Sequence, residues 1–225
     1  METSISNQFL NIVNIEARDL PEAWFLCLKE CLNKGYEYVI DKGSFAGQKR
    51  KEFDFVTIRI KYPGSRPLIP DTPLGIPIPT SMEYIEKYLP YIMIGSNIKK
   101  ENEEYTYGED IEPQMNKIIS ILKNEGFNTN QTCITIGNKT SILLDNPQCL
   151  KVIDVRVRYN KLHFIVYFRS WDLWGGFPAN LAAIQIMKEY MGSELSVEDG
   201  ELIACSKGLH LYDHHWELAK KVIYR

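Results

Sequence analysis

The stretch Val152–Phe168, which reads VIDVRVRYNKLHFIVYF, decides the fold. Two runs rich in β-branched and aromatic residues flank a turn at Asn160-Lys161, and this pattern predicts a β-hairpin. Cys149 stands just before the first strand and Arg169 just after the second. Because a hairpin brings together residues on either side of its turn, we expect the thiol and the guanidinium to lie close across the sheet. Such a guanidinium would lower the pKa of the thiol and hold an anionic ligand.

Polar residues continue after the hairpin. The run RSWDLWGGFPAN covers residues 169–180, and His210-Leu211-Tyr212 follows further along the chain. Together they supply an arginine, a hydroxyl, a carboxylate, an amide, a ring nitrogen and a phenol, an inventory that suits a flat, polar, anionic ligand. Asp172 and Asn180 have an alternative role in a polar turn that caps a helix. Cys149 could be a buried strand cysteine with a packing role instead of a nucleophile. For Cys133 and Cys205 we keep this packing interpretation.

The order Pro-x-Cys, Arg-Ser-x-Asp-x-x-x-Gly-x-Pro-x-Asn and His-x-Tyr, ending at Cys149, Asn180 and Tyr212, resembles the thymidylate synthase family. The run Tyr105-Thr106-Tyr107-Gly108 resembles its archaeal members. The resemblance implies an α/β (α+β) fold with a mixed or antiparallel sheet and flanking helices, and a homodimer. It further implies that a cysteine thiolate attacks C6 of a uracil nucleotide, whose C5 then takes a one-carbon unit from 5,10-methylenetetrahydrofolate or a related reduced pterin.

The same resemblance assigns roles to single residues. It implies catalytic roles for Cys149, Asp172 and Glu86, substrate contacts from Arg169, Ser170, Gly176, Asn180, His210 and Tyr212, and cofactor contacts from Asp172 and Tyr107. Asn180 can both donate and accept, so it can bind N3–H and O4 of uracil, whereas an aspartate would suit cytosine better. His210 and Tyr212 project to one side of a strand, where they could share a ribose hydroxyl.

Phosphate recognition is where the chain departs from the family. Lys49, Arg50 and Lys51 lie near the place of a phosphate-binding arginine in a loop, although a solvated turn is an equal alternative. A pair of arginines that the family donates to the partner subunit is missing, since Asn128–Gln131 reads NTNQ. The chain also ends at Arg225 without the family's C-terminal closing segment. A hydroxymethylase of the same superfamily and a non-catalytic nucleotide-binding homologue therefore stay open as alternatives.

Composition limits the other possibilities. The 225 residues carry 26 basic and 29 acidic side chains, a formal net charge of −3, so we expect no polymeric nucleic acid partner. The 44% hydrophobic content and the absence of a linker-like tract predict one domain over residues 1–225. Met1–Leu20 matches neither a signal peptide nor a membrane span, which predicts a cytoplasmic protein without membrane contact.

The cysteines and histidines do not predict a metal site. Five irregularly spaced cysteines indicate reduced thiols. Cys27 and Cys31 follow the apolar stripe of a helix within Pro21–Leu32, so core packing is favoured over zinc. Asp213-His214-His215 has no helical metal pattern beside it, and zinc is again disfavoured.

The remaining pattern predicts secondary structure. We expect a strand at Phe53–Ile60 in a hairpin within Tyr36–Tyr62, an extended loop at Pro67–Pro79, a helix at Tyr84–Gly95 kinked by Pro90, helices at Pro113–Asn124 and Ala179–Met191, and strands at Thr132–Ile136, Ser141–Leu144 and Leu202–Cys205.

Overall fold

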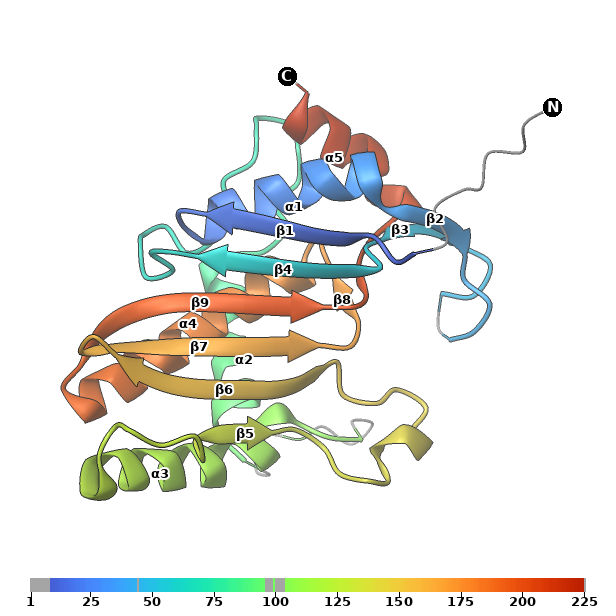
Figure 1. Ribbon diagram of the computed structural model, residues 1–225. Coiled ribbons are helices and arrows are strands. Elements are labelled where there is room, and N and C mark those ends of the chain that lie inside the picture. The colour runs from blue at the N-terminus through green and yellow to red at the C-terminus, as the bar shows by residue number, and fades with distance from the viewer. Residues whose placement is uncertain (1–8, 44, 96–98, 100–103, 225) are drawn as a thin grey trace.

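A six-stranded mixed sheet forms the centre of the protein in the computed structural model, which describes residues 9–43, 45–95, 99 and 104–224 (Figure 1). Its strands are, in spatial order, β1 (Ile12–Ala17), β4 (Phe55–Ile60), β9 (Glu198–Ser206), β7 (Lys161–Phe168), β6 (Leu150–Arg158) and β5 (Cys133–Thr135). β1 with β4 and β7 with β9 are parallel, and the other pairs are antiparallel. The α/β fold with a mixed sheet and flanking helices is thereby confirmed.

The hairpin that the sequence predicts is β6 and β7. Tyr159 and Asn160 form its turn at φ of 54° and 57°, the left-handed values that a tight hairpin needs at both central positions. Leu162, Phe164, Val166 and Phe168 of β7 are buried, and the residues between them are half-buried. One face of the sheet is therefore core, and the other is open.

A second, four-stranded sheet has the order β2 (Tyr36–Val39), β3 (Lys49–Glu52), β10 (Leu209–Tyr212) and β8 (Trp171–Asp172). The run Lys49–Lys51 is part of strand β3, so the loop and the turn that the sequence suggests for it are both wrong. Backbone pairing with β2 on one side and β10 on the other holds this charged strand in place. The hairpin within Tyr36–Tyr62 is β2 with β3, whereas β4 belongs to the larger sheet.

Among the described residues, five α-helices surround the sheets: α1 (Leu20–Lys34), α2 (Met82–Met93), α3 (Tyr107–Glu125), α4 (Gly176–Leu195) and α5 (Trp216–Ile223). Figure 1 shows α4 and α2 behind the larger sheet, whose open face is turned to the viewer. Cys27 and Cys31 are fully buried in α1, as the packing interpretation requires. No helix among the described residues is both long and apolar enough to cross a membrane.

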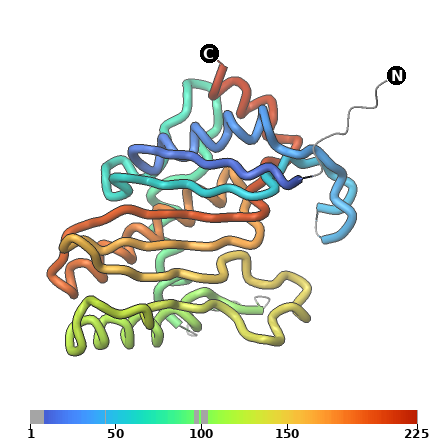
Figure 2. Tube along the Cα trace, in the orientation of Figure 1, coloured from blue at the N-terminus to red at the C-terminus, as the bar shows by residue number. Residues whose placement is uncertain are grey.

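Several elements differ from the ranges expected from the sequence, and two of the differences are large. α3 begins at Tyr107 rather than Pro113, because Thr106 and Glu109 form a capping box in which each side chain bonds the other's backbone N–H. The strand expected at Ser141–Leu144 is wrong, since Ser141–Leu143 is a 3₁₀ helix in the long connection from β5 to β6. That connection extends beyond the end of the sheet at which β6 starts (Figure 2).

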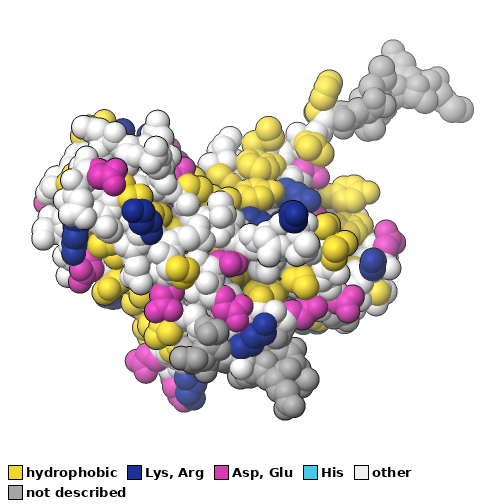
Figure 3. Space-filling view, turned by 90° about the horizontal axis from the view of Figure 1, so that it is seen from below, with side chains coloured by type: hydrophobic (Ala, Val, Ile, Leu, Met, Phe, Trp, Pro, Cys, Tyr) yellow, Lys and Arg dark blue, Asp and Glu magenta, His cyan; other side chains and the backbone are white. Residues whose placement is uncertain are grey.

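The surface is mixed in charge. Viewed from below, Lys and Arg side chains are interspersed with Asp and Glu (Figure 3). Met1–Gln8, Asn102, Glu103 and Arg225, on which some of the sequence-based expectations fall, lie outside the described residues.

Candidate active site

Cys149 and Arg169 lie side by side where the β6–β7 hairpin opens. The backbone N–H of Arg169 donates to the Cys149 carbonyl at 2.9 Å, so the two residues lie opposite each other on neighbouring strands. The Arg169 guanidinium donates from Nε to the Gln148 carbonyl at 3.1 Å and from Nη2 to the Pro147 carbonyl. Its Nη2 also lies 3.9 Å from Cys149 Sγ. The arginine thus holds the segment that carries the thiol.

Protonation of this thiol is set by opposing effects. Burial raises the pKa of Cys149, and the positive charges of Arg169 and Lys151 oppose that rise without cancelling it. The sequence correctly predicts the direction of the arginine's effect but cannot weigh it against desolvation, which dominates. The Cys149 thiol is therefore mainly neutral at pH 7, and the thiolate forms only when a proton is removed.

Two tyrosines line the same corner. The Tyr107 hydroxyl accepts from the Leu150 N–H at 3.4 Å, one residue from the thiol. Its ring contacts that of Tyr105, with centroids 5.7 Å apart. Burial raises the pKa of both phenols, which consequently stay protonated and can donate hydrogen bonds near the thiol.

Asp172 organises the start of helix α4. Its Oδ2 accepts from the N–H groups of Gly175 and Gly176, both at 2.9 Å, and its Oδ1 accepts from the Trp174 N–H at 3.3 Å. The carboxylate thereby satisfies backbone donors at the helix N-terminus, where negative charge is favourable. Asp172 therefore caps helix α4, which is the alternative role that the sequence left open for it. The same side chain also lines the cavity described next.

Asn180 faces a cavity of about 450 Å³ between α4, α2 and the segment 78–81. Its Oδ1 accepts from Trp171 Nε1 at 2.9 Å and its Nδ2 donates to the Tyr88 hydroxyl at 2.7 Å. These two bonds fix the orientation of the amide and leave one N–H and one lone pair for a ligand. The stacked rings of Tyr84 and Tyr88, with centroids 5.8 Å apart and planes at 17°, form an aromatic wall of the same cavity.

His210 and Tyr212 come from β10, beside β8 and β3. His210 pairs in register with Asp172, and Tyr212 with Arg50. Burial lowers the pKa of His210 to about 4, so its ring is neutral at pH 7. Nδ1 lies 2.8 Å from the Gly208 carbonyl and must donate, which leaves the buried Nε2 as an acceptor without a partner. A ligand hydroxyl would satisfy it.

The basic side chains of β3, Lys49, Arg50 and Lys51, already bind other groups of the protein. Arg50 pairs with Glu52 at 2.9 Å and donates to the Tyr38 hydroxyl. Lys49 Nζ lies 3.4 Å from Glu37, and Lys51 Nζ donates to the Leu32 carbonyl at 3.1 Å. Of the three basic residues, Arg50 is the one that pairs in register with Tyr212 of β10.

The structure does not bring every expected residue to the site. Glu86 is exposed on α2, whereas Tyr84 and Tyr88 on either side of it in sequence face the cavity. Ser170 follows Arg169 and is half-buried, and Gly176 lies at the first turn of α4. Sequence reasoning missed Tyr84 and Tyr88, although their spacing of four places them on one helix face.

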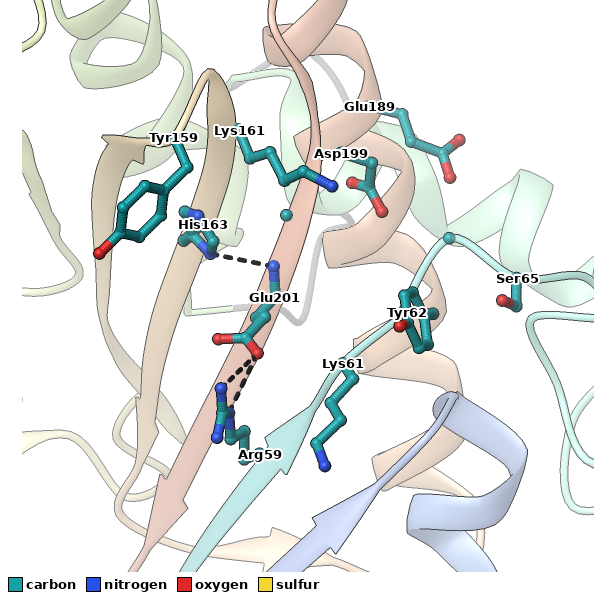
Figure 4. A pocket seen from close by; sticks show the side chains of 12 residues that line it. Arg59, Lys61, Tyr62, Ser65, Tyr159, Lys161, His163, Glu189, Asp199 and Glu201 are labelled. Atoms are coloured by element: carbon teal, nitrogen blue, oxygen red, sulfur yellow. Dashed lines mark hydrogen bonds and ion pairs between the residues drawn. The ribbon is translucent and has the colours of Figure 1, made fainter.

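A larger cavity, of about 780 Å³, lies beside the β6–β7 turn, at the end of the hairpin opposite to Cys149. Figure 4 shows the side chains that line it. It is lined by side chains of both charges, among which Arg59 bonds Glu201 at 2.7 Å. It contains no cysteine and none of the residues that the motifs single out. We therefore take the cluster around Cys149 as the candidate active site. Within the described part of the chain, no three His, Cys, Asp or Glu side chains gather as metal ligands.

Comparison with known proteins identifies the family of the chain. The family model described as thymidylate synthase matches residues 93–225, a segment that contains Cys149, the 169–180 run and His210-Leu211-Tyr212. The chain belongs to the thymidylate synthase family. Family membership supports a one-carbon transfer to a uracil nucleotide and places the protein among the transferases.

Archaeal proteins are prominent among the relatives of the chain. A protein named "Putative thymidylate synthase" from Methanosarcina mazei is 27% identical over 215 residues, which cover 93% of this chain and 94% of the relative. One of the same name from Methanococcoides burtonii is 26% identical with the same coverage. A thymidylate synthase of Buchnera aphidicola is 29% identical over 119 residues, 52% of this chain and 44% of that protein.

Proposed function

We propose that the protein transfers a one-carbon unit from 5,10-methylenetetrahydrofolate to C5 of deoxyuridylate or a close uracil nucleotide. The observation that carries the proposal is the adjacency of the Cys149 thiol to the Arg169 guanidinium. Tyr212 lies within electrostatic range of both Cys149 and Asp172, and Asp172 lines the cavity that Asn180 faces. A nucleophile, an anion-binding group and a base-reading amide are the three parts that such a reaction needs.

Cys149 is the residue that forms the covalent bond. Its thiolate adds to C6 of the uracil ring, and the C5–C6 electron pair moves onto C5 and O4. The free N–H of Asn180 would hold the charge on O4, while the free lone pair on Oδ1 accepts N3–H. C5 would then bond to the one-carbon unit as the bond from that carbon to the folate nitrogen breaks, and the C5 proton would pass to water. In a methyl transfer, hydride would add to the exocyclic carbon as the S–C6 bond breaks and Cys149 leaves as the thiolate.

The remaining residues bind and orient. Arg169 and Ser170 hold the phosphate side of the nucleotide, and Nε2 of His210 accepts from a ribose hydroxyl, assisted by Tyr212. Asp172 holds Gly176 and the start of α4, and so positions Asn180 one turn further on. Glu86 is exposed and has no part in this proposal.

The cavity beside Asn180 suits a flat aromatic co-substrate. Tyr84 and Tyr88 offer stacked ring faces, Asp172 offers a carboxylate, and Tyr107 closes the region nearer the thiol. These residues would hold the pterin of the reduced folate. When bound, the folate supplies the one-carbon unit and, in a methyl transfer, the hydride that completes it.

Product analysis tests the function. We expect the wild type, incubated with deoxyuridylate and 5,10-methylenetetrahydrofolate, to form thymidylate and dihydrofolate. A 5-hydroxymethyl product with tetrahydrofolate would identify the hydroxymethylase instead. Tight nucleotide binding without either product would assign the chain to the non-catalytic homologues, and both of these results would contradict the proposal.

Asn180→Asp should change the base preference. The aspartate keeps the acceptor but loses the N–H that faces O4, and it gains an affinity for the cytosine amino group. We expect kcat/KM for deoxyuridylate to fall by about 5- to 150-fold, with a relative gain for deoxycytidylate, since an unpaired buried polar group costs ~1–3 kcal/mol. Competition between the two nucleotides measures the ratio. A wild type that already prefers deoxycytidylate would show that Asn180 is misassigned.

We further propose a homodimer through the open face of the larger sheet. Val152, Ile165, Tyr167 and Ile203 lie in neighbouring strands on this face and are each partly exposed. Arg59 of β4 pairs with Ile203 and marks the edge of this apolar strip. A contiguous apolar surface of this kind on a sheet is typical of an interface between subunits.

A further inference from the structure

Charge is distributed unevenly over the candidate site. The cations Arg169 and Lys151 lie at the end that holds Cys149, where both act on the thiol. The cavity that Asn180 faces has a different character. Of the described residues that line it, none is Lys, Arg or His, and Asp172 is the one acidic residue. A ligand that enters this cavity therefore meets a carboxylate and no basic side chain in the lining.

Two helices begin at this cavity, and neither N-terminus is free to bind an anion. At the start of α4, the N–H groups of Gly175 and Gly176 donate to the Asp172 carboxylate. At the start of α2, the Ser81 hydroxyl accepts from the Tyr84 N–H at 3.1 Å, and the acidic Glu83 lies in the first turn. A helix N-terminus attracts negative charge, but a carboxylate of the protein already stands at each of these two.

An aromatic surface leads from the interior of the cavity to solvent. Tyr88 is half-buried, and its hydroxyl accepts from Asn180 Nδ2 at 2.7 Å. Tyr84 stacks on Tyr88 and is 51% exposed, and Ile78, which lines the same cavity, is 57% exposed. Exposed apolar side chains that border a cavity are typical of ligand-binding grooves. The mouth of the cavity thus offers apolar contact to the part of a ligand that extends outward.

A reduced folate has parts that differ in charge along its length. The pterin is joined to an aromatic amine ring, and this ring carries a tail of one or more glutamates, each of which adds a carboxylate. With the pterin against Tyr88 and Asp172, the amine ring lies toward Tyr84 and Ile78, and the tail lies beyond them. In that position the tail has no charge-assisted donor among the side chains that line the cavity.

We propose that the co-substrate is a reduced pterin whose tail carries little negative charge, and that Ile78 and Tyr84 select it through apolar contact with the aromatic amine ring. The proposal rests on the one-carbon transfer proposed above and names the class of co-substrate for the same site. Charge on the tail then brings no affinity, whereas the aromatic ring does.

Three pterins that differ in tail charge test this selection. Tetrahydropteroate has no glutamate, tetrahydrofolate has one, and tetrahydrofolate pentaglutamate has the longest anionic tail. Without a one-carbon unit none of them reacts, so their affinities can be titrated against the wild type saturated with deoxyuridylate. We expect the three dissociation constants to agree within ~2-fold, because exposed charges without a partner contribute little. Binding that tightens by ~3-fold or more along the series would overturn the inference.

Substitutions at the mouth test the apolar contact. Tyr84→Ala and Ile78→Ala should each weaken all three pterins alike, by ~5- to 10-fold, and leave the affinity for deoxyuridylate unchanged. Tyr84→Phe keeps the ring and should bind as the wild type does. Tyr190→Ala is the matched control, since Tyr190 is a similarly exposed tyrosine on α4 outside the cavity lining. Unchanged pterin binding in Tyr84→Ala, or a loss in Tyr84→Phe as large as in Tyr84→Ala, would contradict the proposal.

A charge placed at the mouth should create the preference that the wild type lacks. In Ile78→Lys, we expect the pentaglutamate to bind ~3- to 10-fold more tightly than tetrahydropteroate, because the new ammonium group meets the glutamate carboxylates. Ile12→Lys alters a similarly exposed isoleucine on β1, outside the cavity lining, and should leave the ratio as in the wild type. Equal binding of both pterins in Ile78→Lys would show that the tail does not pass this segment and would overturn the inference.

These outcomes are separable from those of the proposed function. If the wild type forms thymidylate but prefers the pentaglutamate, the inference fails and the function stands. If the three pterins bind alike but no product forms from deoxyuridylate, the proposed function fails and the cavity remains a pterin site. Failure to bind any of the three would overturn both.

Discussion

Replacing Cys149 by alanine is expected to lower one-carbon transfer at least ~10³-fold, the size of loss that follows when a nucleophile is removed from a covalent mechanism. The side chain makes no structural hydrogen bond apart from its 3.9 Å contact with Arg169, while the backbone bond between the two residues does not depend on the thiol. The variant should therefore fold and bind the nucleotide. Initial rates and nucleotide titrations on the same preparation measure the two effects.

Two other cysteines serve as controls for this substitution. Cys205 is half-buried on the neighbouring strand β9, and Cys133 is exposed on β5. Burial raises the pKa of both thiols, and neither lies beside an arginine. Cys205→Ala and Cys133→Ala should keep wild-type rates. Full activity in Cys149→Ala, with loss in either control, would show that the nucleophile lies elsewhere.

Replacing Arg169 by alanine should cost ~10²–10³-fold in kcat/KM, because it removes both a phosphate ligand and the two bonds that hold the Pro147-Gln148 segment. The loss should exceed that of any single alanine change at Lys49, Arg50 or Lys51, whose side chains are committed to other partners. Arg169→Lys keeps the charge but not the forked geometry and should recover only part of the activity.

The same variant should alter the titration of the thiol. Burial raises the pKa of Cys149 and the Arg169 charge lowers it, so loss of that charge should move the pKa still higher. Since only the thiolate reacts with iodoacetamide, alkylation of Cys149 should rise with pH, and its inflection should lie at higher pH in Arg169→Ala than in the wild type. Strong phosphate dependence that survives Arg169→Ala, or an inflection at lower pH, would contradict these roles.

The sequence predicts the elements whose residues follow one pattern along their whole length. Val152–Phe168 is rich in β-branched and aromatic residues on both sides of a short polar break, and the β6–β7 hairpin is where the pattern puts it, with the turn one residue earlier, at Tyr159-Asn160. Strand β3 escapes prediction because Lys49–Glu52 has no apolar alternation, and its pairing with two distant strands is invisible in the local sequence. The predicted start of α3 is too late because Pro113 resembles a helix boundary, although the Thr106 and Glu109 capping pair lies just upstream.

Much of the candidate site could be anticipated, and the exceptions have physical reasons. Motif order and the hairpin together bring Cys149 to Arg169. The bond between Asn180 and Tyr88 spans 92 positions and depends on how α2 packs against α4. The dominance of burial over charge at the thiol depends on the folded surroundings, which no spacing rule supplies.

Mass spectrometry of the wild type after incubation with 5-fluorodeoxyuridylate and 5,10-methylenetetrahydrofolate tests the central claim most directly. The fluorine replaces the proton that must leave C5, so the reaction should stop with nucleotide and folate both attached to the protein. We predict one such adduct per chain, on the peptide that contains Cys149. An adduct mapped to Cys133 or Cys205, or an unmodified protein that nevertheless binds both small molecules, would contradict the account.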